Sequence, residues 1–356
     1  MRGRLEQVQT YAGTDLADST GLGDAASFVV DLLERPGSDI RVVEGQLGLG
    51  EDLVVPGHPD GFHLTPLSPE EPGTVWAVDG GSCILADGRS FQVAAYRASR
   101  VRFAGGVTDR VESPPLEVRA LSRDEMARIH RDRLEAMKAP LPETTPDITR
   151  PVDFLRECAE WTEVRRTIHD AEPGDLVLVD GSLHGGPLIP PSFVRRIHQE
   201  ALERGVVLAG VVKASTLFWG RNAPLVALLK RRGDRELGAV TWSARISTDP
   251  TFARLYVGEI FVSHLAPTAP HAFRVDVARG PGPSEDALAR LAGAAGDPAF
   301  VGYPYPLARA HQAARVSGYA VVDLRRAFRE ALSGRGMAED DIETLFQDFH
   351  EVLNRS

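Results

Sequence analysis

The sequence predicts an α/β fold, in which helices flank a mixed sheet and further helices lie toward the N- and C-terminal ends. Two uninterrupted apolar segments, 175–180 and 205–213, have the pattern of strands buried on both faces, as in parallel sheets. The segment between them begins at Pro190-Pro191 and keeps a helical pattern to about Arg204. A strand, a helix and a strand with short connections indicate a parallel crossover.

Composition restricts the class of protein. The chain has 356 residues, of which 43% are hydrophobic, so a large core can be buried. No apolar run approaches the ~18 residues that a membrane span needs, and the first residues lack the apolar stretch of a secretory signal. The two cysteines indicate reduced thiols rather than a disulfide framework. We therefore expect a cytoplasmic protein without a membrane partner.

The charge of the chain limits which kinds of nucleic-acid-binding protein it can be. The formal net charge of −10 argues against a protein that coats nucleic acid, because neutralising phosphates requires clustered Lys and Arg. It leaves a nucleic-acid enzyme open, because metal-binding carboxylates add negative charge and basic residues can be confined to a channel. The chain has no Walker A motif, so any ATP-driven work would need a partner.

Local patterns predict the remaining elements. Strands are expected at about 74–79, 90–103, 254–263 and 271–278. Helices are expected at about 25–34, 121–138, 152–170, 306–316, 322–333 and 338–354. A passage rich in Pro and Gly follows the first helix, so we divide the chain into an N-terminal helical segment (1–55), a main domain (56–330) and a C-terminal helix (331–356). The tryptophans are expected in the core, and Arg274 on a charged outer face.

Two aspartates occupy matching positions in the sequence. Asp79 and Asp180 each end an apolar segment, each is followed by glycine, and a serine comes soon after. In open α/β sheets ligands bind outside the carboxyl ends of strands, where two neighbouring carboxylates can share a divalent cation such as Mg²⁺ or Mn²⁺. Asp-Gly is also a common turn signal that needs no chemistry. The repetition and the order of the surrounding elements favour a metal site.

That order of elements follows the ribonuclease-H-like pattern. More specifically, several segments in their order resemble the NurA nuclease family over roughly residues 70–320. These segments are TVWAVDGGS, the helix 152–170, DLVLVDGSLHGG, GVVLAGVVKAS and GYPYPLARAHQAARVS. One departure is Gly80-Gly81 before Ser82, where the commoner family pattern is Asp-Gly-Ser; it puts the role of Ser82 in doubt.

The resemblance implies a ribonuclease-H-like fold, a homodimer, and cleavage of single- and double-stranded DNA with Mn²⁺. Mg²⁺ is the alternative metal, with one or two ions in each site. The resemblance also implies a HerA-type hexameric ATPase as partner in the resection and repair of double-strand breaks, and hence a nucleoid-associated location. Two alternatives stay open at this point. One is another ribonuclease-H-like nuclease that acts on RNA or on DNA junctions, and the other is a catalytically silent DNA-end clamp for the ATPase.

The resemblance also implies the site residues. The strand-end aspartates map to Asp79 and Asp180. The family's glutamate lies on the preceding helix, which points to Glu163, with Glu160 one turn away on nearly the same face as the second choice. Either glutamate is otherwise a solvated helix residue.

The late Tyr-to-His segment maps to Tyr303 and His311. His311 would ligate the metal or transfer a proton, or else cap a helix at the surface. Tyr303 would orient a phosphate or pack in the core, and Tyr305 is its rival. Lys213 ends a predicted strand beside the aspartates, where it would contact phosphate or extend into solvent. The implied catalytic set is therefore Asp79, Glu163, Asp180, Tyr303 and His311, with all but the tyrosine as metal ligands.

Overall fold

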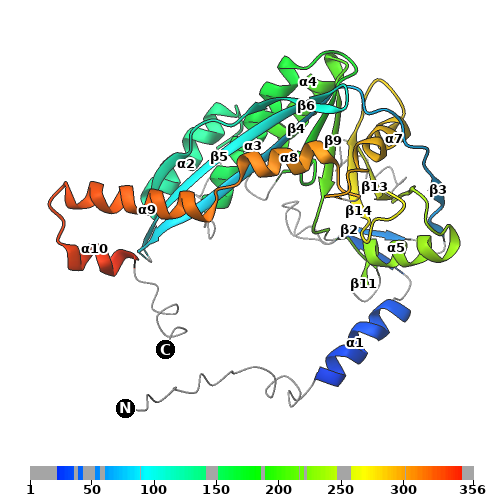
Figure 1. Ribbon diagram of the computed structural model, residues 1–356, viewed down its shortest axis with the longest axis horizontal. Helices are drawn as coiled ribbons and strands as arrows, with labels where there is room; N and C mark the ends of the chain where they lie inside the picture. Colours follow the sequence, from blue (N-terminus) through cyan, green and yellow to red (C-terminus); the bar gives the residue numbers. More distant parts are fainter. Residues whose placement is uncertain are drawn as a thin grey trace, which may run out of the picture.

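A mixed sheet of ten strands forms the centre of the molecule (Figure 1). The computed structural model describes residues 22–35, 39–42, 53–56, 61–88, 90–141, 151–185, 189–215, 217–219, 223–246, 258–300 and 302–346. The strands of the large sheet, in chain order, are β3 (Leu64–Pro66), β4 (Val75–Asp87), β5 (Phe91–Ala104), β6 (Val107–Glu112), β7 (Glu117–Ser122), β8 (Leu176–Asp180), β9 (Val207–Val212), β12 (Trp242–Arg245), β13 (Gly258–His264) and β14 (Phe273–Ala278). Their order in space is β3-β12-β13-β14-β9-β8-β4-β5-β6, and β7 pairs with the first half of β5.

The central five strands have the predicted ribonuclease-H-like arrangement. Strands β4, β5 and β6 form an antiparallel meander, and β8 and β9 then follow parallel to β4. Helix α3 (Pro151–Asp170) connects the meander to β8, and helix α4 (Pro191–Glu203) connects β8 to β9. The predicted α/β class and the predicted crossover are therefore confirmed.

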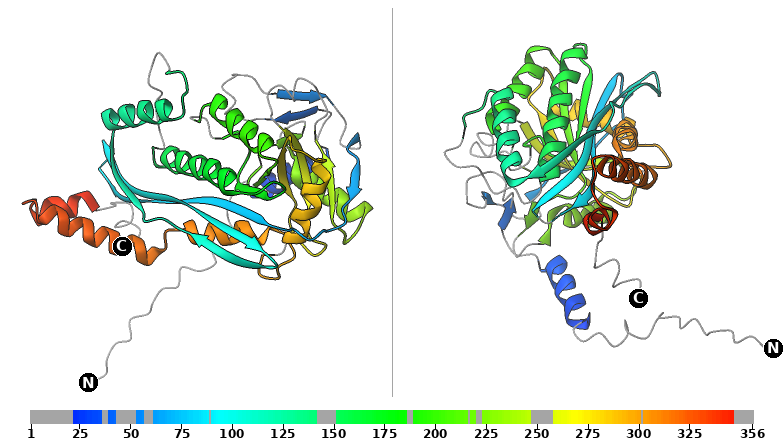
Figure 2. Two further views of the ribbon diagram at one scale, coloured as in Figure 1. Left: turned by 90° about the horizontal axis from the view of Figure 1, so that it is seen from above. Right: turned by 90° about the vertical axis from the view of Figure 1, so that its left-hand side faces the viewer.

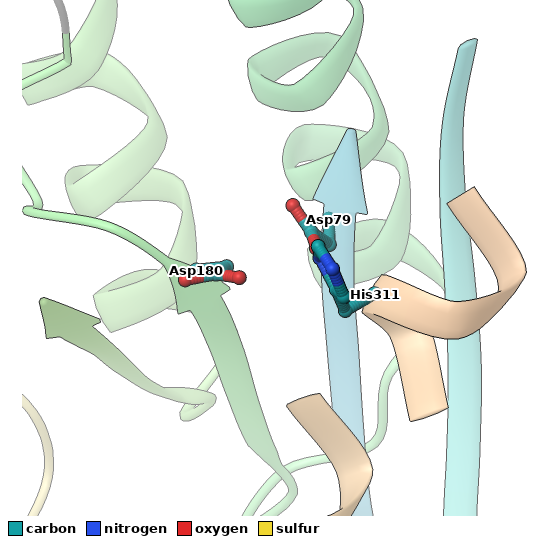
Figure 3. A group of neighbouring side chains, drawn as sticks. All are labelled: Asp79, Asp180 and His311. Carbon is teal, nitrogen blue, oxygen red and sulfur yellow. The ribbon is translucent and has the colours of Figure 1, made fainter. Parts of the chain in front are cut away.

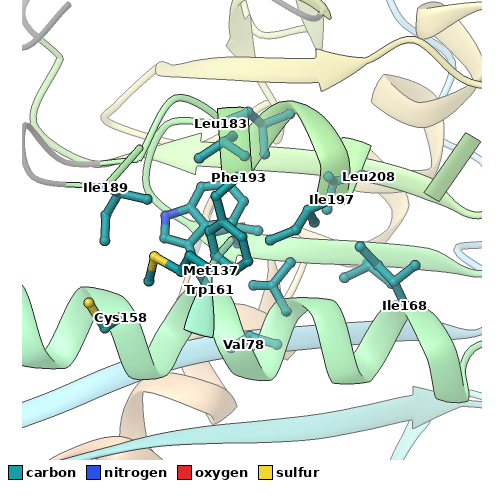
Figure 4. Close-up of a cluster of buried hydrophobic side chains, with 14 of the residues drawn as sticks. Val78, Met137, Cys158, Trp161, Ile168, Leu183, Ile189, Phe193, Ile197 and Leu208 are labelled. Carbon is teal, nitrogen blue, oxygen red and sulfur yellow. The ribbon is translucent and has the colours of Figure 1, made fainter. Parts of the chain in front are cut away.

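Helices cover both faces of this sheet, as Figure 2 shows from two further directions. Helices α2 (Arg123–Ala136), α3 and α4 lie on one face, where Trp76 and Val78 of β4 point into a cluster of buried apolar side chains (Figure 4). Helices α7 (Ser284–Ala294) and α8 (Tyr305–Ala314) lie on the other, over Val75 and Ala77. Successive residues of a strand point to opposite faces, so β4 contributes to both cores.

The last two helices extend along the far half of the β4–β5 hairpin (Figure 1). Helix α9 (Gly318–Ser333) begins after Ser317, whose hydroxyl accepts a hydrogen bond from the backbone N–H of Ala320. Leu324 and Phe328 of this helix pack with Phe346 of α10 (Glu339–Phe346) against apolar side chains of β4 and β5. The predicted helix 338–354 is present to residue 346, and its remainder lies outside the described residues.

The predicted N-terminal segment contains more than a helix. Helix α1 (Leu22–Glu34) is present, but β1 (Asp39–Val42) and β2 (Leu53–Pro56) are strands. They form a small four-stranded sheet with β10 (Leu217–Trp219) and β11 (Ala223–Pro224), which is followed by helix α5 (Leu225–Glu236). The predicted boundaries at 55/56 and 330/331 fall within β2 and within α9.

Burial confirms one expectation and corrects another. The four tryptophans are core residues, none more than 3% exposed. Arg274, expected on a charged outer face, is buried on β14, where its guanidinium donates hydrogen bonds to the Asp276 carboxylate at 2.7 and 3.0 Å. The alternation of charge and apolar residues matched an outer face, but the partner two residues along the strand allows burial. Among the described residues, no helix combines the length and apolar character that crossing a membrane requires.

Candidate metal centre

Asp79 and Asp180 lie where the sheet divides between β4 and β8. The last pair between these two strands joins Val78 to Val179, whereas β4 continues beside β5 to Asp87. Asp180 is the last residue of β8, and Asp79 is one residue beyond the end of the pairing. The matching positions that the sequence predicted therefore bring the two carboxylates to one place.

His311 of α8 completes a group of three. Its Nδ1 is 2.7 Å from Oδ2 of Asp79, and one ligand atom from each of Asp79, Asp180 and His311 lies within 4.8 Å of the other two. Figure 3 shows the three side chains approaching one another from β4, β8 and α8. Asp79 is buried, whereas the His311 side chain is half exposed, so the group has a protected side and an open side.

A glycine allows α8 to approach so closely. A Cβ on Gly81 would collide with the carbonyl group of Ala314 at the end of α8. Arg97 of β5 donates hydrogen bonds to the carbonyl oxygens of Ala314 and Arg315, both at 3.1 Å, and so holds the last turn of α8 against the sheet. Gly81 stands where the NurA pattern commonly has serine. The absence of a side chain at this position makes room for α8, the helix that carries His311.

Glu160 reaches the same region from the opposite face of the sheet. Its carboxyl group occupies the space that a side chain on Gly80 would take. The pKa of Glu160 is raised to about 8, mainly by burial and also by the charges of Asp79, Glu157 and Asp180, although its ion-pair partner Arg156 lowers it. Glu160 is outside the group of three ligand atoms, but the two aspartates act on its carboxyl group.

Glu163, the first choice made from the sequence, faces away from the three ligand atoms and toward Arg100. Its carboxylate lies 3.1 Å from Nε of Arg100, which also pairs with Glu112 at 2.8 Å and Asp170 at 2.7 Å. We call these four residues the Arg100 cluster. Residues three apart on a helix differ by about 60° in direction, since each residue turns it by about 100°. That difference directs Glu160 toward the aspartates and Glu163 toward Arg100.

Lys213 and Tyr303 lie beside Asp180. The Lys213 ammonium group forms an ion pair with the Asp180 carboxylate and is 5.3 Å from the centre of the Tyr303 ring. The Tyr303 hydroxyl is buried without a hydrogen-bond partner, and burial followed by the charges of Asp180 and Asp79 raises its pKa well above the usual range. Tyr305, its rival, instead packs its ring edge-on against Phe103 at 5.8 Å.

On its buried side, the group of Asp79, Asp180 and His311 carries an excess of negative charge. Burial and the charge of Asp180 together raise the pKa of Asp79 to about 6, although His311 and Lys213 lower it. Two carboxylates so close favour a shared cation, and carboxylate oxygens with an imidazole nitrogen suit Mn²⁺ or Mg²⁺. The residues present therefore fit a divalent metal.

Comparison with known proteins gives the fold. No protein-family model and no curated protein matches the chain. The NurA nuclease of Sulfolobus solfataricus is similar in structure, with a TM-score of 0.54, 15% identity, and 88% of this chain and 95% of that chain covered. Two further structures, of NurA bound to dAMP and manganese and of NurA alone, have TM-scores of 0.52 and 0.51, each with 11% identity and with 91% of this chain and 99% of theirs covered. The chain has the fold of the NurA structures, as the sequence predicted.

Proposed function

We propose that this chain is a metal-dependent deoxyribonuclease of the NurA type. The convergence of Asp79, Asp180 and His311 carries the proposal, because these ligands could hold a divalent metal, and such a metal can activate water for phosphodiester hydrolysis. The shared fold supports it, and one of the similar proteins is NurA bound to dAMP and manganese. We infer single-strand endonuclease activity and exonuclease activity on single- and double-stranded DNA.

The proposed roles follow from the positions of the side chains. Asp79, Asp180 and His311 would hold one or two Mn²⁺ or Mg²⁺ ions, with Glu160 rather than Glu163 as the contributing glutamate. Bound there, the metal would acidify the attacking water and stabilise the charge of the leaving oxygen. Asp79 fixes the orientation of the His311 ring through the hydrogen bond from Nδ1, which leaves the lone pair of Nε2, on the half-exposed side, to bind the metal.

Two further side chains would act on the phosphate. Lys213 is half exposed and lies at the edge of the group, so its ammonium group can turn from Asp180 to a phosphate oxygen of the substrate. The Tyr303 hydroxyl has no hydrogen-bond partner within the chain and would donate a hydrogen bond to the same phosphate. Both side chains are therefore proposed to orient the phosphodiester for in-line attack.

Digestion of labelled DNA tests the proposal. Wild-type protein is expected to cleave plasmid and single-stranded DNA when Mn²⁺ is supplied and to stop when EDTA is added. The Asp180→Asn protein, which keeps the size of the side chain but not its charge, is expected to bind DNA without cleaving it. Cleavage that continues in EDTA, or wild-type protein that binds DNA but never cuts it, would overturn the proposal; the second result indicates a DNA-end clamp.

We further propose a homodimer that works with a HerA-type hexameric ATPase in DNA end resection and repair by homologous recombination. The net charge of −10 makes non-specific DNA binding by a single subunit weak, and the sequence lacks a Walker A motif. A dimer that encloses DNA and an ATPase that feeds it would compensate for both. The ATPase with ATP is expected to stimulate digestion of long duplex DNA more than of short single strands, because short strands diffuse into the site unaided.

Light scattering and a paired digestion assay test this assembly. A monomeric mass at micromolar concentration would rule out the dimer. Equal digestion of long duplex DNA with and without the ATPase would rule out the partnership, and neither result would affect the metal centre.

A further inference from the structure

A surface hollow of about 670 Å³ lies at the junction of α8 and α9, next to the candidate metal centre. It is lined by Gln312, Arg315, Ser317, Gly318, Tyr319 and Val322. Gln312 directly follows His311 in the sequence, and Arg315 is one helical turn, about 6 Å, beyond it. The hollow therefore begins within one turn of a proposed metal ligand.

Two apolar side chains in the hollow are unusually exposed. Tyr319 is 87% exposed and Val322 65%, although both belong to a helix whose other side is packed. Leu324 and Phe328 hold that other side against the β4–β5 hairpin. The ring of Tyr319 is thus presented to solvent from an anchored helix, which limits the ordering cost of binding to it.

The residues that line the hollow suit a ligand that combines an aromatic ring with a negative charge. None of its six residues is acidic, in a chain with a net charge of −10. Within the part of the chain that the structure describes, no ion pair involves Arg315, and its side chain is exposed. Aromatic rings stack on nucleobases of any sequence, and an arginine neutralises a phosphate.

We propose that this hollow binds an unpaired nucleobase of the substrate strand, stacked on Tyr319, with Arg315 on an adjacent phosphate. This inference rests on the proposed nuclease function. A turn of helix corresponds to one or two nucleotides, since a strand of duplex DNA rises by about 3.4 Å per nucleotide. The base bound here would therefore lie one or two nucleotides from the scissile phosphate, and it would hold the strand in register for cleavage.

A thermodynamic cycle between the base and the tyrosine tests the stacking. The probes are a fluorescein-labelled thymidine 20-mer and the same backbone without bases, with affinity measured by anisotropy in EDTA so that neither is cut. Loss of the bases is expected to weaken binding to wild-type protein. The ratio of the affinities with and without bases should be about tenfold smaller in Tyr319→Ala, since stacking contributes about 1–3 kcal/mol per base. Tyr319→Phe and Tyr319→Trp keep a ring and are expected to behave as wild type.

Matched controls separate the hollow from general effects. Phe28, at 65% exposure, is also an exposed aromatic residue and belongs to α1, which Figure 1 shows on the other side of the molecule from α9, so Phe28→Ala should leave both affinities unchanged. Arg315→Gln is expected to reduce the slope of log affinity against log salt by about 0.7, the value of one phosphate contact on a single strand. Arg326→Gln is the control, because Arg326 lies on α9, the helix that carries Tyr319, and already pairs with Asp323 at 3.0 Å.

Three results would overturn the inference. The first is an equal effect of base removal in wild-type protein and Tyr319→Ala while metal-dependent cleavage persists; the nuclease proposal would then survive without the hollow. The second is dissociation of a wild-type dimer into monomers by Tyr319→Ala in light scattering, which would make the hollow an interface between copies. The third is wild-type protein that neither binds nor cleaves single-stranded DNA, and in that case the nuclease proposal itself fails.

Discussion

Helix α3 lies between two clusters of charged side chains that differ in which charge is buried. In the Arg100 cluster the buried group is the cation: the Arg100 side chain is 1% exposed and contacts three carboxylates, of which Asp170 is 45% exposed. At the metal centre the buried groups are the acids. Their cationic neighbours Lys213 and His311 are 43% and 52% exposed.

The difference teaches how a structural cluster of charges can be distinguished from a binding site. A buried guanidinium that forms ion pairs with several carboxylates has its charge neutralised within the chain. The buried carboxylates of the metal centre are not neutralised in this way: burial first, and then the charges of neighbouring acids, raise the pKa values of Asp79 and Glu160 to about 6 and about 8. Such a group gains stability from an added cation, whereas the Arg100 cluster would not.

The largest effect should come from removing one of the paired aspartates. Asp79→Asn and Asp180→Asn are each expected to abolish Mn²⁺-dependent cleavage, because each removes a metal-binding charge. Without metal, neither variant should melt at a lower temperature than wild type, because each relieves repulsion. Cleavage assays and thermal melts measure the two effects. Retained cleavage that still needs metal would remove that aspartate from the site.

The two glutamates of α3 test the comparison most directly. Glu160→Gln is expected to reduce cleavage by about a hundredfold or more, the scale of losing one electrostatic contact to the reacting group, whereas Glu163→Gln should change it less than about threefold. The sequence favoured the opposite result, with Glu163 essential. If Glu163→Gln is the inactive variant in the cleavage assay, then the α3 face assigned to the metal centre is wrong.

Much of the site could be predicted because it follows from local patterns. The apolar segment before Asp180 marks a buried strand, and its resemblance to the segment before Asp79 marks a second one. Parallel neighbours then require the two aspartates to lie together. The family resemblance added His311, and the structure places it against Asp79.

The rest depends on contacts between distant segments. The choice between Glu160 and Glu163 is set by Gly80 and Arg100, which lie on other elements and leave no periodic signal in the helix. The small sheet that pairs 39–42 with 217–219 joins parts of the chain far apart in sequence. The hollow beside Tyr319 could not have been predicted either, because the helical pattern does not tell which apolar side chains stay uncovered.

Removing a cation from each cluster should separate stability from activity. Arg100→Leu leaves three carboxylates without their shared partner, so it is expected to lower the free energy of unfolding by about 3–5 kcal/mol. Lys213→Ala removes a half-exposed cation, so it should change stability by less than about 1 kcal/mol while reducing cleavage. Urea unfolding and cleavage of the folded fraction would measure both. A large loss of stability in Lys213→Ala would mean that the rim cations are structural too.

The smallest expected effect is a dependence of stability on pH. Burial raises the pKa of Glu160 from 4.5 to about 8, so the folded state binds this proton more tightly than the unfolded state does. The stability from this group is complete below pH 4.5 and is lost as the pH rises toward 8. The loss should be about 1 kcal/mol or a few at most, because neighbouring side chains relax around the charged carboxylate. Metal-free Glu160→Gln should therefore lose less stability than wild type between about pH 5 and 8 in urea titrations.

Mn²⁺ should flatten the wild-type curve as well, because the ion supplies the positive charge that the buried side of this cluster lacks. Equal slopes in the two metal-free proteins would show that Glu160 is already neutralised by Arg156, as the acids around Arg100 are by their guanidinium. The distinction between the clusters would then rest on the two aspartates alone.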